Sequence, residues 1–215
     1  GEVLDLLRQR LRAVVYLAGA VRSNQLTEAI ERSLLDLPLD ESRTLLSDWR
    51  GHVSSLAERL DREALPIRVM VNDDAPPPVI PALNGRVAVS IEYDPQQYRG
   101  TAGLLHDVTR DYDAGDLVLV VGGAQLLLRP LDDLALRLAD EESDAALLAH
   151  ADGTPSSVML VRCGALEQVK SRGFLDLKEQ FLPELATTGT VKLIEARSPI
   201  TAPTRRSSPS SPRNT

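Results

Sequence analysis

Ala13-Val14-Val15-Tyr16-Leu17-Ala18-Gly19 is the most informative segment of this chain. Its first five residues form an uninterrupted apolar run, which predicts a strand buried on both faces, as in a parallel sheet. The Ala-Gly pair that follows predicts a tight turn. Because glycine lets the backbone come close to a ligand, this strand end is a candidate contact for a phosphate or a base.

Similar strand signals, each followed by a helical pattern, recur along the sequence. We expect further strands at 67–71, 87–91, 117–121, 145–148, 157–161 and 191–194. We expect helices over 41–60, from Gly100 to Tyr112, over 130–138 and over 173–185, with Ser42 or Asp40 capping the first. Such alternation predicts a single three-layer α/β/α domain with a mostly parallel sheet.

The predicted domain covers residues 1–197. The remaining segment, 198–215, is rich in Ser, Pro, Thr and Arg and almost without apolar residues, so we predict a disordered tail. A chain of 215 residues that is 43% hydrophobic can bury one sizeable core.

Composition narrows the function classes. The net charge of -7 argues against a nucleic-acid surface, which needs clustered Lys and Arg. No apolar run approaches the roughly 20 residues that cross a bilayer, so we expect a cytoplasmic protein with no membrane partner. The single cysteine, Cys163, excludes an internal disulfide and is expected to be a small core residue.

Four blocks follow one another in a recognisable order: Leu17-Ala18-Gly19-Ala20-Val21-Arg22 with Gln25-Leu26-Thr27, Glu31-Arg32-Ser33-Leu34-Leu35-Asp36-Leu37-Pro38, Arg99-Gly100-Thr101-Ala102-Gly103, and Val120-Val121-Gly122-Gly123-Ala124. Taken together they resemble the sugar-1-phosphate nucleotidyltransferases, which join a sugar phosphate to a nucleoside triphosphate and release pyrophosphate. The segments Ser157–Val161 and Gly173–Gln180 resemble the strand and loop on the sugar side of these enzymes. The resemblance covers about residues 13–197 and implies a Rossmann-like, nucleotide-diphospho-sugar transferase-like fold.

The resemblance also implies a site. Its nucleotide contacts would be Leu17, Ala18, Gly19, Gly100, Thr101 and Ala102. Arg22 falls where the family holds the triphosphate, and Arg32 is the nearest counterpart of a lysine that stabilises charge on the reacting phosphates, so both are candidate catalytic residues. Asn72 and Asp176 are candidate substrate contacts. The implied partners are a nucleoside triphosphate with a sugar phosphate, or the nucleotide sugar, in nucleotide-sugar and polysaccharide biosynthesis.

The ability to bind Mg²⁺ distinguishes the two functions that the resemblance allows. The family's metal-binding aspartate is replaced here by Ala124, so we assign no metal ligand, although an active enzyme would need Mg²⁺ to bridge the phosphates. Asp132 and Asp133 are interpreted as helix-dipole partners in a first turn. The chain is therefore either a nucleotidyltransferase or a catalytically inactive nucleotide- or nucleotide-sugar-binding or assembly module. The sequence is compatible with a homo-oligomer and leaves the oligomeric state open.

Two further arrangements receive less support. A glycosyltransferase of similar topology would want an Asp-x-Asp pair at a strand end, and Asp111-Tyr112-Asp113 has this spelling but is predicted to end a helix. The three histidines, His52, His106 and His150, fall on separate predicted elements. No Ser/His/Asp nucleophile arrangement follows from them.

Overall fold

The structure of the protein, a computed structural model, describes residues 1–18, 39–72, 86–94, 100–122, 125–168, 182–196 and 198–203. Its helices are α1 (Glu2–Arg10), α3 (Leu45–Arg59), α4 (Gly100–Val108), α5 (Leu131–Ala139), α6 (Leu182–Thr188) and the 3-10 helix η2 (Cys163–Gln168). Its strands are β1 (Leu11–Leu17), β2 (Ile67–Asn72), β3 (Val89–Asp94), β4 (Leu117–Gly122), β5 (Gln125–Leu127), β6 (Ala145–Ala149), β7 (Pro155–Arg162), β8 (Val191–Glu195) and β9 (Thr201–Pro203).

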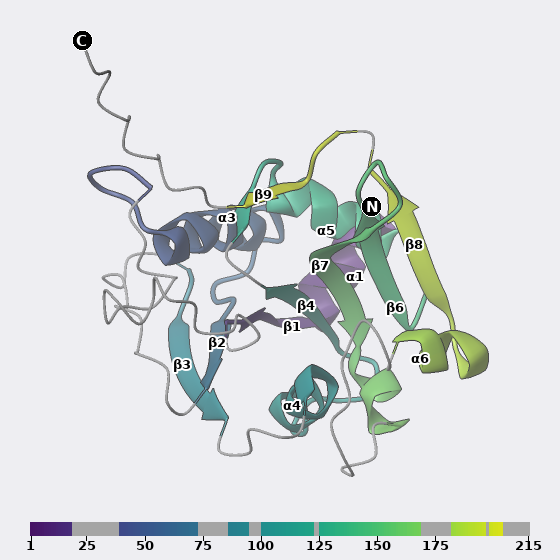
Figure 1. Cartoon of the computed structure of the whole chain (residues 1–215). Coiled ribbons are helices and arrows are strands. Elements are labelled where there is room, and N and C mark those ends of the chain that lie inside the picture. Colours follow the sequence, from purple (N-terminus) through teal and green to yellow (C-terminus); the bar gives the residue numbers. More distant parts are fainter. Residues whose placement is uncertain are drawn as a thin grey trace.

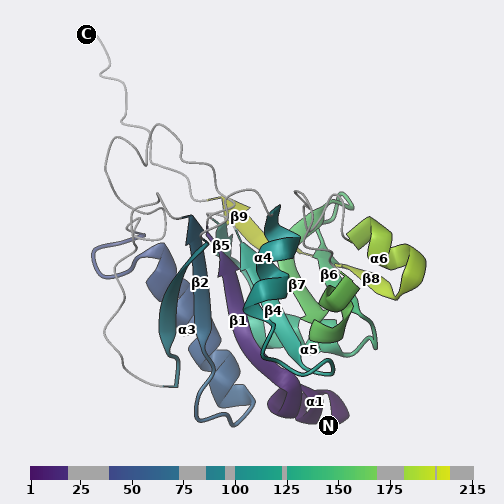
Figure 2. The same cartoon turned by 90° about the horizontal axis from the view of Figure 1, so that it is seen from below.

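A seven-stranded sheet in the order β3-β2-β1-β4-β7-β6-β8 forms the middle layer (Figure 2). β1 pairs in parallel with β2 and β4, β2 with β3, and β6 with β8. β7 pairs antiparallel with both of its neighbours, β4 and β6. Every strand of this sheet except β7 therefore points the same way. The predicted α/β fold with a mostly parallel sheet is confirmed.

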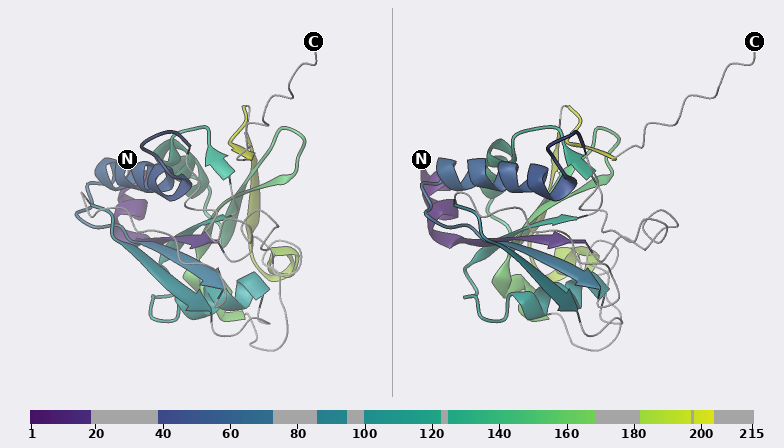
Figure 3. Two further views of the ribbon diagram at one scale, coloured as in Figure 1. Left: turned by 60° about the vertical axis from the view of Figure 1, so that its left-hand side comes forward. Right: turned by 90° about the vertical axis from the view of Figure 1, so that its left-hand side faces the viewer.

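The two faces of the sheet carry separate apolar clusters because successive side chains of a strand point to opposite sides. Val14 and Tyr16 of β1 belong to the cluster that includes Trp49 of α3. Val15 belongs to the other cluster, with Leu105 of α4. Helices α1, α3 and α5 cover the first face, and α4, η2 and α6 cover the second (Figures 1 and 3). This is the predicted three-layer arrangement.

Helix α3 begins later than predicted and with a different cap. Thr44 is the N-cap: its side chain accepts the Ser47 N–H, and the Ser47 hydroxyl accepts the Thr44 N–H. Asp40 cannot cap the helix because its carboxylate accepts the backbone N–H groups of Ser42 and Arg43 in a tight local turn. The prediction that Ser42 or Asp40 caps the helix was therefore wrong, and the helix starts at Leu45.

A second, two-stranded sheet was not predicted. β5 pairs antiparallel with β9, and Leu128 N–H donates to Ile200 O at 2.8 Å beside the pair. Trp49 of α3 donates from its indole Nε1 to Gln125 O at 3.0 Å, which fixes β5 against the main layer. β9 lies inside the segment that was predicted as a tail, so ordered structure continues to Pro203.

Candidate functional site

The carboxyl ends of β1, β2, β3 and β4 lie along one edge of the sheet, because these strands are parallel. The strand order reverses at β1: β2 and β3 lie on one side of it, and β4 lies on the other. In open α/β sheets, ligands bind at such a reversal, outside the carboxyl ends of the strands. The candidate site is therefore the edge formed by Leu17 and Ala18 after β1 and by Gly122 at the end of β4.

Three register partners form a row across this edge. Leu17 is paired with Met70 of β2 on one side and with Gly122 of β4 on the other. Leu17 and Met70 belong to the apolar cluster on the α4 face, so the row faces α4. Gly122 carries no side chain, and a Cβ built there would meet only Leu17 among the described residues, at 3.6 Å. The row is thus apolar over β2 and β1, and over β4 it carries no side chain.

Helix α4 points its amino end at this row. Ala102, in its first turn, is fully buried in the same cluster as Leu17 and Met70. At the other end of the helix, Val108 O accepts from Arg68 Nη1 at 2.5 Å, and Arg68 lies two positions before Met70 on β2. The helix therefore runs from the carboxyl edge toward the opposite edge.

Arg68 fixes that orientation. Its guanidinium donates to Glu92 of β3 at 2.6 Å and to the Tyr112 hydroxyl at 3.1 Å. The hydrogen bond to Glu92 raises the pKa of Arg68. A charge-assisted, bidentate pair of this kind is both strong and directional. It ties β2, β3 and the end of α4 together, and it holds the start of α4 over the site.

Gly100 opens α4 in a backbone conformation that suits glycine. Its φ of 70° lies in the left-handed region, where a side chain would be strained. The first turn of α4 contains no acidic residue, so no carboxylate of the helix itself offsets its positive dipole end. Backbone donors in this position suit an anion or the polar edge of a base.

The structure brings together part of the predicted nucleotide site. Leu17, Ala18, Gly100, Thr101 and Ala102 lie at the carboxyl edge or in the first turn of α4. Asn72 ends β2 at the same edge, where it is described through its backbone. Gly19, Arg22, Arg32, Asp176 and Ala124 lie outside the described residues. Gly122 also lies at this edge and was not predicted as a contact, although an apolar run that ends at a glycine was a signal for it.

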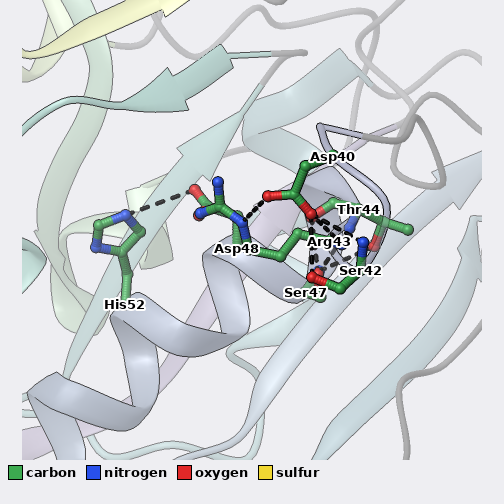
Figure 4. Close-up of polar contacts among 7 residues, drawn as sticks. All are labelled: Asp40, Ser42, Arg43, Thr44, Ser47, Asp48 and His52. Carbon is green, nitrogen blue, oxygen red and sulfur yellow. Dashed lines mark hydrogen bonds and ion pairs between the residues drawn. The ribbon is translucent and has the colours of Figure 1, made fainter.

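A polar cluster stands at the amino end of α3 (Figure 4). Arg43 donates to Asp40 at 2.7 Å and to Asp48 at 3.2 Å, and His52 Nε2 lies 3.6 Å from Asp48. The hydrogen bond from Arg43, helped by the Ser42 N–H, lowers the pKa of Asp40 to about 2. These contacts fix the start of α3, which packs on the opposite face of the sheet from α4.

The remaining charged groups named from the sequence lie elsewhere. Asp132 and Asp133 of α5 pair with Arg59 of α3 at 3.1 Å and 3.8 Å, in agreement with a structural role. Asp111 and Asp113 precede β4, at the edge opposite the site, so the Asp-x-Asp spelling does not mark a ligand site at the carboxyl edge. Among the described residues, no group of three His, Cys, Asp or Glu side chains could hold a metal ion.

The opposite edge holds a buried carboxylate. Asp116 is 1% exposed, and it accepts from Arg12 Nε at 2.9 Å and from the Asp113 N–H at 2.9 Å. Burial opposes its charge, but these donors and the cation lower its pKa overall. Cys163 is buried next to it, and desolvation raises the pKa of its thiol to about 12. The prediction that Cys163 is a core residue is confirmed.

The architecture is a Rossmann-like α/β fold with one antiparallel strand in an otherwise parallel sheet and with small residues at the edge where the strand order reverses. In the part of the chain with described placement, no helix has the length and apolar character needed to cross a bilayer. No protein-family model matches the sequence, and no curated protein matches it significantly.

Solved structures share the fold. HddC from Yersinia pseudotuberculosis has a TM-score of 0.59 at 15% identity, over 86% of this chain and 90% of that one. The same protein complexed with GMP-PN has a TM-score of 0.56 at 15% identity, over 87% of this chain and 91% of that one. A Bacillus anthracis protein assigned as a glucose-1-phosphate thymidylyltransferase, solved with a sucrose, has a TM-score of 0.61 at 12% identity, over 86% and 87%. The nucleotidyltransferase-like fold predicted from the sequence is confirmed.

Proposed function

We propose that the chain binds a nucleotide at the carboxyl edge of its sheet and transfers the nucleotidyl group to a sugar 1-phosphate. The observation that carries this proposal is the convergence of Leu17-Ala18, Gly122 and the left-handed Gly100 on one edge. Two strand ends and one helix start bring their backbone to this edge. Open backbone suits phosphates and bases, which are recognised largely by N–H and C=O groups.

The proposed reaction has a simple balance. An oxygen of the sugar 1-phosphate attacks the α-phosphorus of the nucleoside triphosphate and forms a new P–O bond. The bond between the α-phosphorus and the oxygen bridging to the β-phosphate breaks, and pyrophosphate leaves with the electron pair. The products are a nucleotide sugar, of the kind consumed in glycan synthesis, and pyrophosphate.

The solved neighbours support this class. One was determined with GMP-PN and another with a sucrose, and the second is assigned as a thymidylyltransferase. Arg22 and Arg32 remain the proposed phosphate contacts, and Asp176 and Asn72 the proposed contacts to the substrate. Among the described residues, no group of His, Cys, Asp or Glu side chains fits a divalent cation.

A second function, a nucleotide- or nucleotide-sugar-binding module without catalysis, is favoured by one observation. The row of Met70, Leu17 and Gly122 at this edge is apolar or without a side chain, and the described residues contain no carboxylate cluster. Such an edge can hold a ligand through backbone groups and packing. It offers nothing by itself to stabilise the charge that develops during phosphoryl chemistry.

The two functions are separated by one pair of measurements. The protein is incubated with each nucleoside triphosphate, a series of hexose 1-phosphates and magnesium, and pyrophosphate release is followed. Turnover that requires both substrates supports the enzyme. Calorimetry with the same nucleotides, with and without magnesium, tests the module: magnesium-independent binding without turnover supports it, and no binding of any nucleotide overturns both functions.

A further inference from the structure

The Arg68 guanidinium contacts both ends of one stretch of the chain, residues 92–112. Glu92 of β3 lies before α4 in the sequence and accepts from Arg68 Nε at 2.6 Å. Val108 O and the Tyr112 hydroxyl lie at and after the carboxyl end of α4, and they accept from Nη1 at 2.5 Å and 3.1 Å. A single side chain of β2 therefore binds both the start and the end of this stretch.

These contacts hold the guanidinium more firmly than those of an ordinary surface arginine. The side chains of Arg68 and Glu92 are 21% and 31% exposed, so solvent screens the pair only partly. The Tyr112 ring adds a cation–π contact, with its centroid 5.8 Å from Arg68 Cζ. Val108 O lies at the negative end of the α4 dipole, where a cation is favoured. Together these partners hold the guanidinium in one orientation.

Apolar packing holds α4 against the sheet. Ala102 and Leu105 are fully buried, in the same cluster as Val15 and Leu17 of β1. Such contacts fix how close a helix lies to its neighbours, but they are not directional. Helix packing angles scatter by about 15–20° around their preferred values, so apolar packing alone permits a tilt of about 10°. The hydrogen bonds at Val108 supply the direction that the apolar contacts lack.

A tilt of α4 moves its amino end at the site edge. Gly100 lies five residues before the buried Leu105, which is about 7.5 Å along a helix axis. A tilt of about 10° around Leu105 therefore moves Gly100 by about 1.3 Å. An N–H group bonds an oxygen when the two heavy atoms are about 2.7–3.2 Å apart, so a shift of this size breaks a hydrogen bond to a ligand. The placement of the helix start thus depends on hydrogen bonds at the other end of the helix.

We propose that Arg68 is a positioning residue for the nucleotide: by holding Glu92 and Val108 together it fixes the tilt of α4 and so places residues 100–102 where they bind the ligand. The Arg68 guanidinium is directed at the carboxyl end of α4, away from the site edge, so it is assigned no contact with the ligand. This inference rests on the proposed function, because it takes the nucleotide to contact the start of α4.

The test measures nucleotide affinity by calorimetry in Arg68→Met, which keeps much of the side-chain length but has no hydrogen-bond donor. The probes are ATP, GTP, CTP, UTP and dTTP, and the one that the wild type binds is used. We expect Arg68→Met to weaken its binding about tenfold, which corresponds to the loss of one hydrogen bond to a charged group. Binding is measured at a temperature at which melting curves show each variant to be folded.

Arg162→Met is the matched control. Arg162 also donates to a carboxylate and to a backbone carbonyl, Asp144 at 2.9 Å and Ala114 O at 3.2 Å, and neither residue belongs to α4. Its loss should lower the melting temperature as the loss of Arg68 does, and it should leave nucleotide affinity unchanged.

Arg68→Lys is a second variant, used also where Arg68→Met does not fold. Lysine keeps the positive charge but lacks the planar fork that binds a carboxylate and a carbonyl at once, so binding should weaken about threefold.

Each alternative result has a separate meaning. Nucleotide binding as tight as that of the wild type in Arg68→Met overturns the inference while the proposed function stands. Binding as tight as that of the wild type in Arg68→Lys also overturns it, because the fixed fork is then not needed. Equal weakening in Arg68→Met and Arg162→Met overturns it too, because the loss then follows general stability. Failure of the wild type to bind any of these nucleotides overturns the proposed function first, and the inference with it.

Discussion

Replacing Gly122 with alanine should stabilise the fold and weaken ligand binding at the same time. A Cβ at this position lies 3.6 Å from both the Cβ and the carbonyl oxygen of Leu17, which is ordinary van der Waals contact. Gly122 is not among the described glycines with positive φ, so alanine can adopt its backbone. Restricting the unfolded chain should then add about 0.4–1 kcal/mol to the free energy of unfolding. For a chain of this size the melting temperature should rise by about 1–4 °C.

The same methyl group would project from the end of β4 beside Leu17, on the side where the ligand is proposed to lie. Overpacking of a close-fitting site costs about 1–3 kcal/mol, which is roughly a fivefold to 150-fold loss of affinity. Calorimetry with the nucleotide that the wild type binds measures this loss, and differential scanning fluorimetry measures the melting temperature. Gly51→Ala is the control: Gly51 lies in α3 with no atom within 4 Å of an added Cβ, so it should gain stability without any change in binding.

If Gly122→Ala binds nucleotide as tightly as the wild type, the ligand does not lie over the end of β4. A clear loss of stability would refute the packing argument separately. The opposite signs expected for stability and affinity are informative, since a merely misfolded variant would lose both.

Three other predictions concern the frame around the site. Arg62→Met removes donors to the carbonyls of Arg8 at 3.0 Å and Leu11 at 2.7 Å, so the free energy of unfolding in urea should fall by about 1–3 kcal/mol, and an unchanged midpoint would contradict this. Trp49→Phe keeps the packing but leaves Gln125 O without its indole donor; a loss of about 1–3 kcal/mol is expected in the same assay, and a stability equal to wild type would count against the role given to this bond. Asp40 and Asp144 have lowered pKa values in the fold, Asp40 through Arg43 and Asp144 chiefly through the Thr190 N–H, so their stabilisation is present above about pH 4 and is lost as the pH falls toward 2. Melting temperatures measured between pH 2 and pH 6 should show this decline. The decline should be shallower in Asp40→Asn, and an identical profile in this variant would contradict the role given to Asp40.

The layered fold could be predicted because its central strands β1, β4 and β6 are buried on both faces. The continuous apolar runs at β1 and β4 predicted buried strands. The helical spacing of apolar residues predicted α3, even though its cap was misassigned. Thr44, and not Asp40, is the N-cap because the Asp40 carboxylate already accepts two backbone N–H groups of its own turn. β5 and β9 were missed because three-residue strands carry no periodicity, and their pairing depends on chain segments that are far apart in sequence.

The sequence predicted individual segments of the candidate site, but not how the fold brings them together. The glycine turn after β1 and the Gly-Thr-Ala-Gly start of α4 were both visible, but a local pattern does not say that β4 lies beside β1. The register that places Gly122 beside Leu17 is set by the tertiary structure, so it cannot be deduced from the local sequence.

The strand order has a consequence for synthesis on the ribosome. β1, β2 and β3 are neighbours both in sequence and in the sheet, so this half, with α3 packed on it, can assemble while the rest of the chain is still being made. The other side of β1 then stays bare until residues 117–122 emerge to pair with it. Exposed strand edges are sites of aggregation in nascent chains. The central strand of the finished sheet is thus its most vulnerable surface during translation.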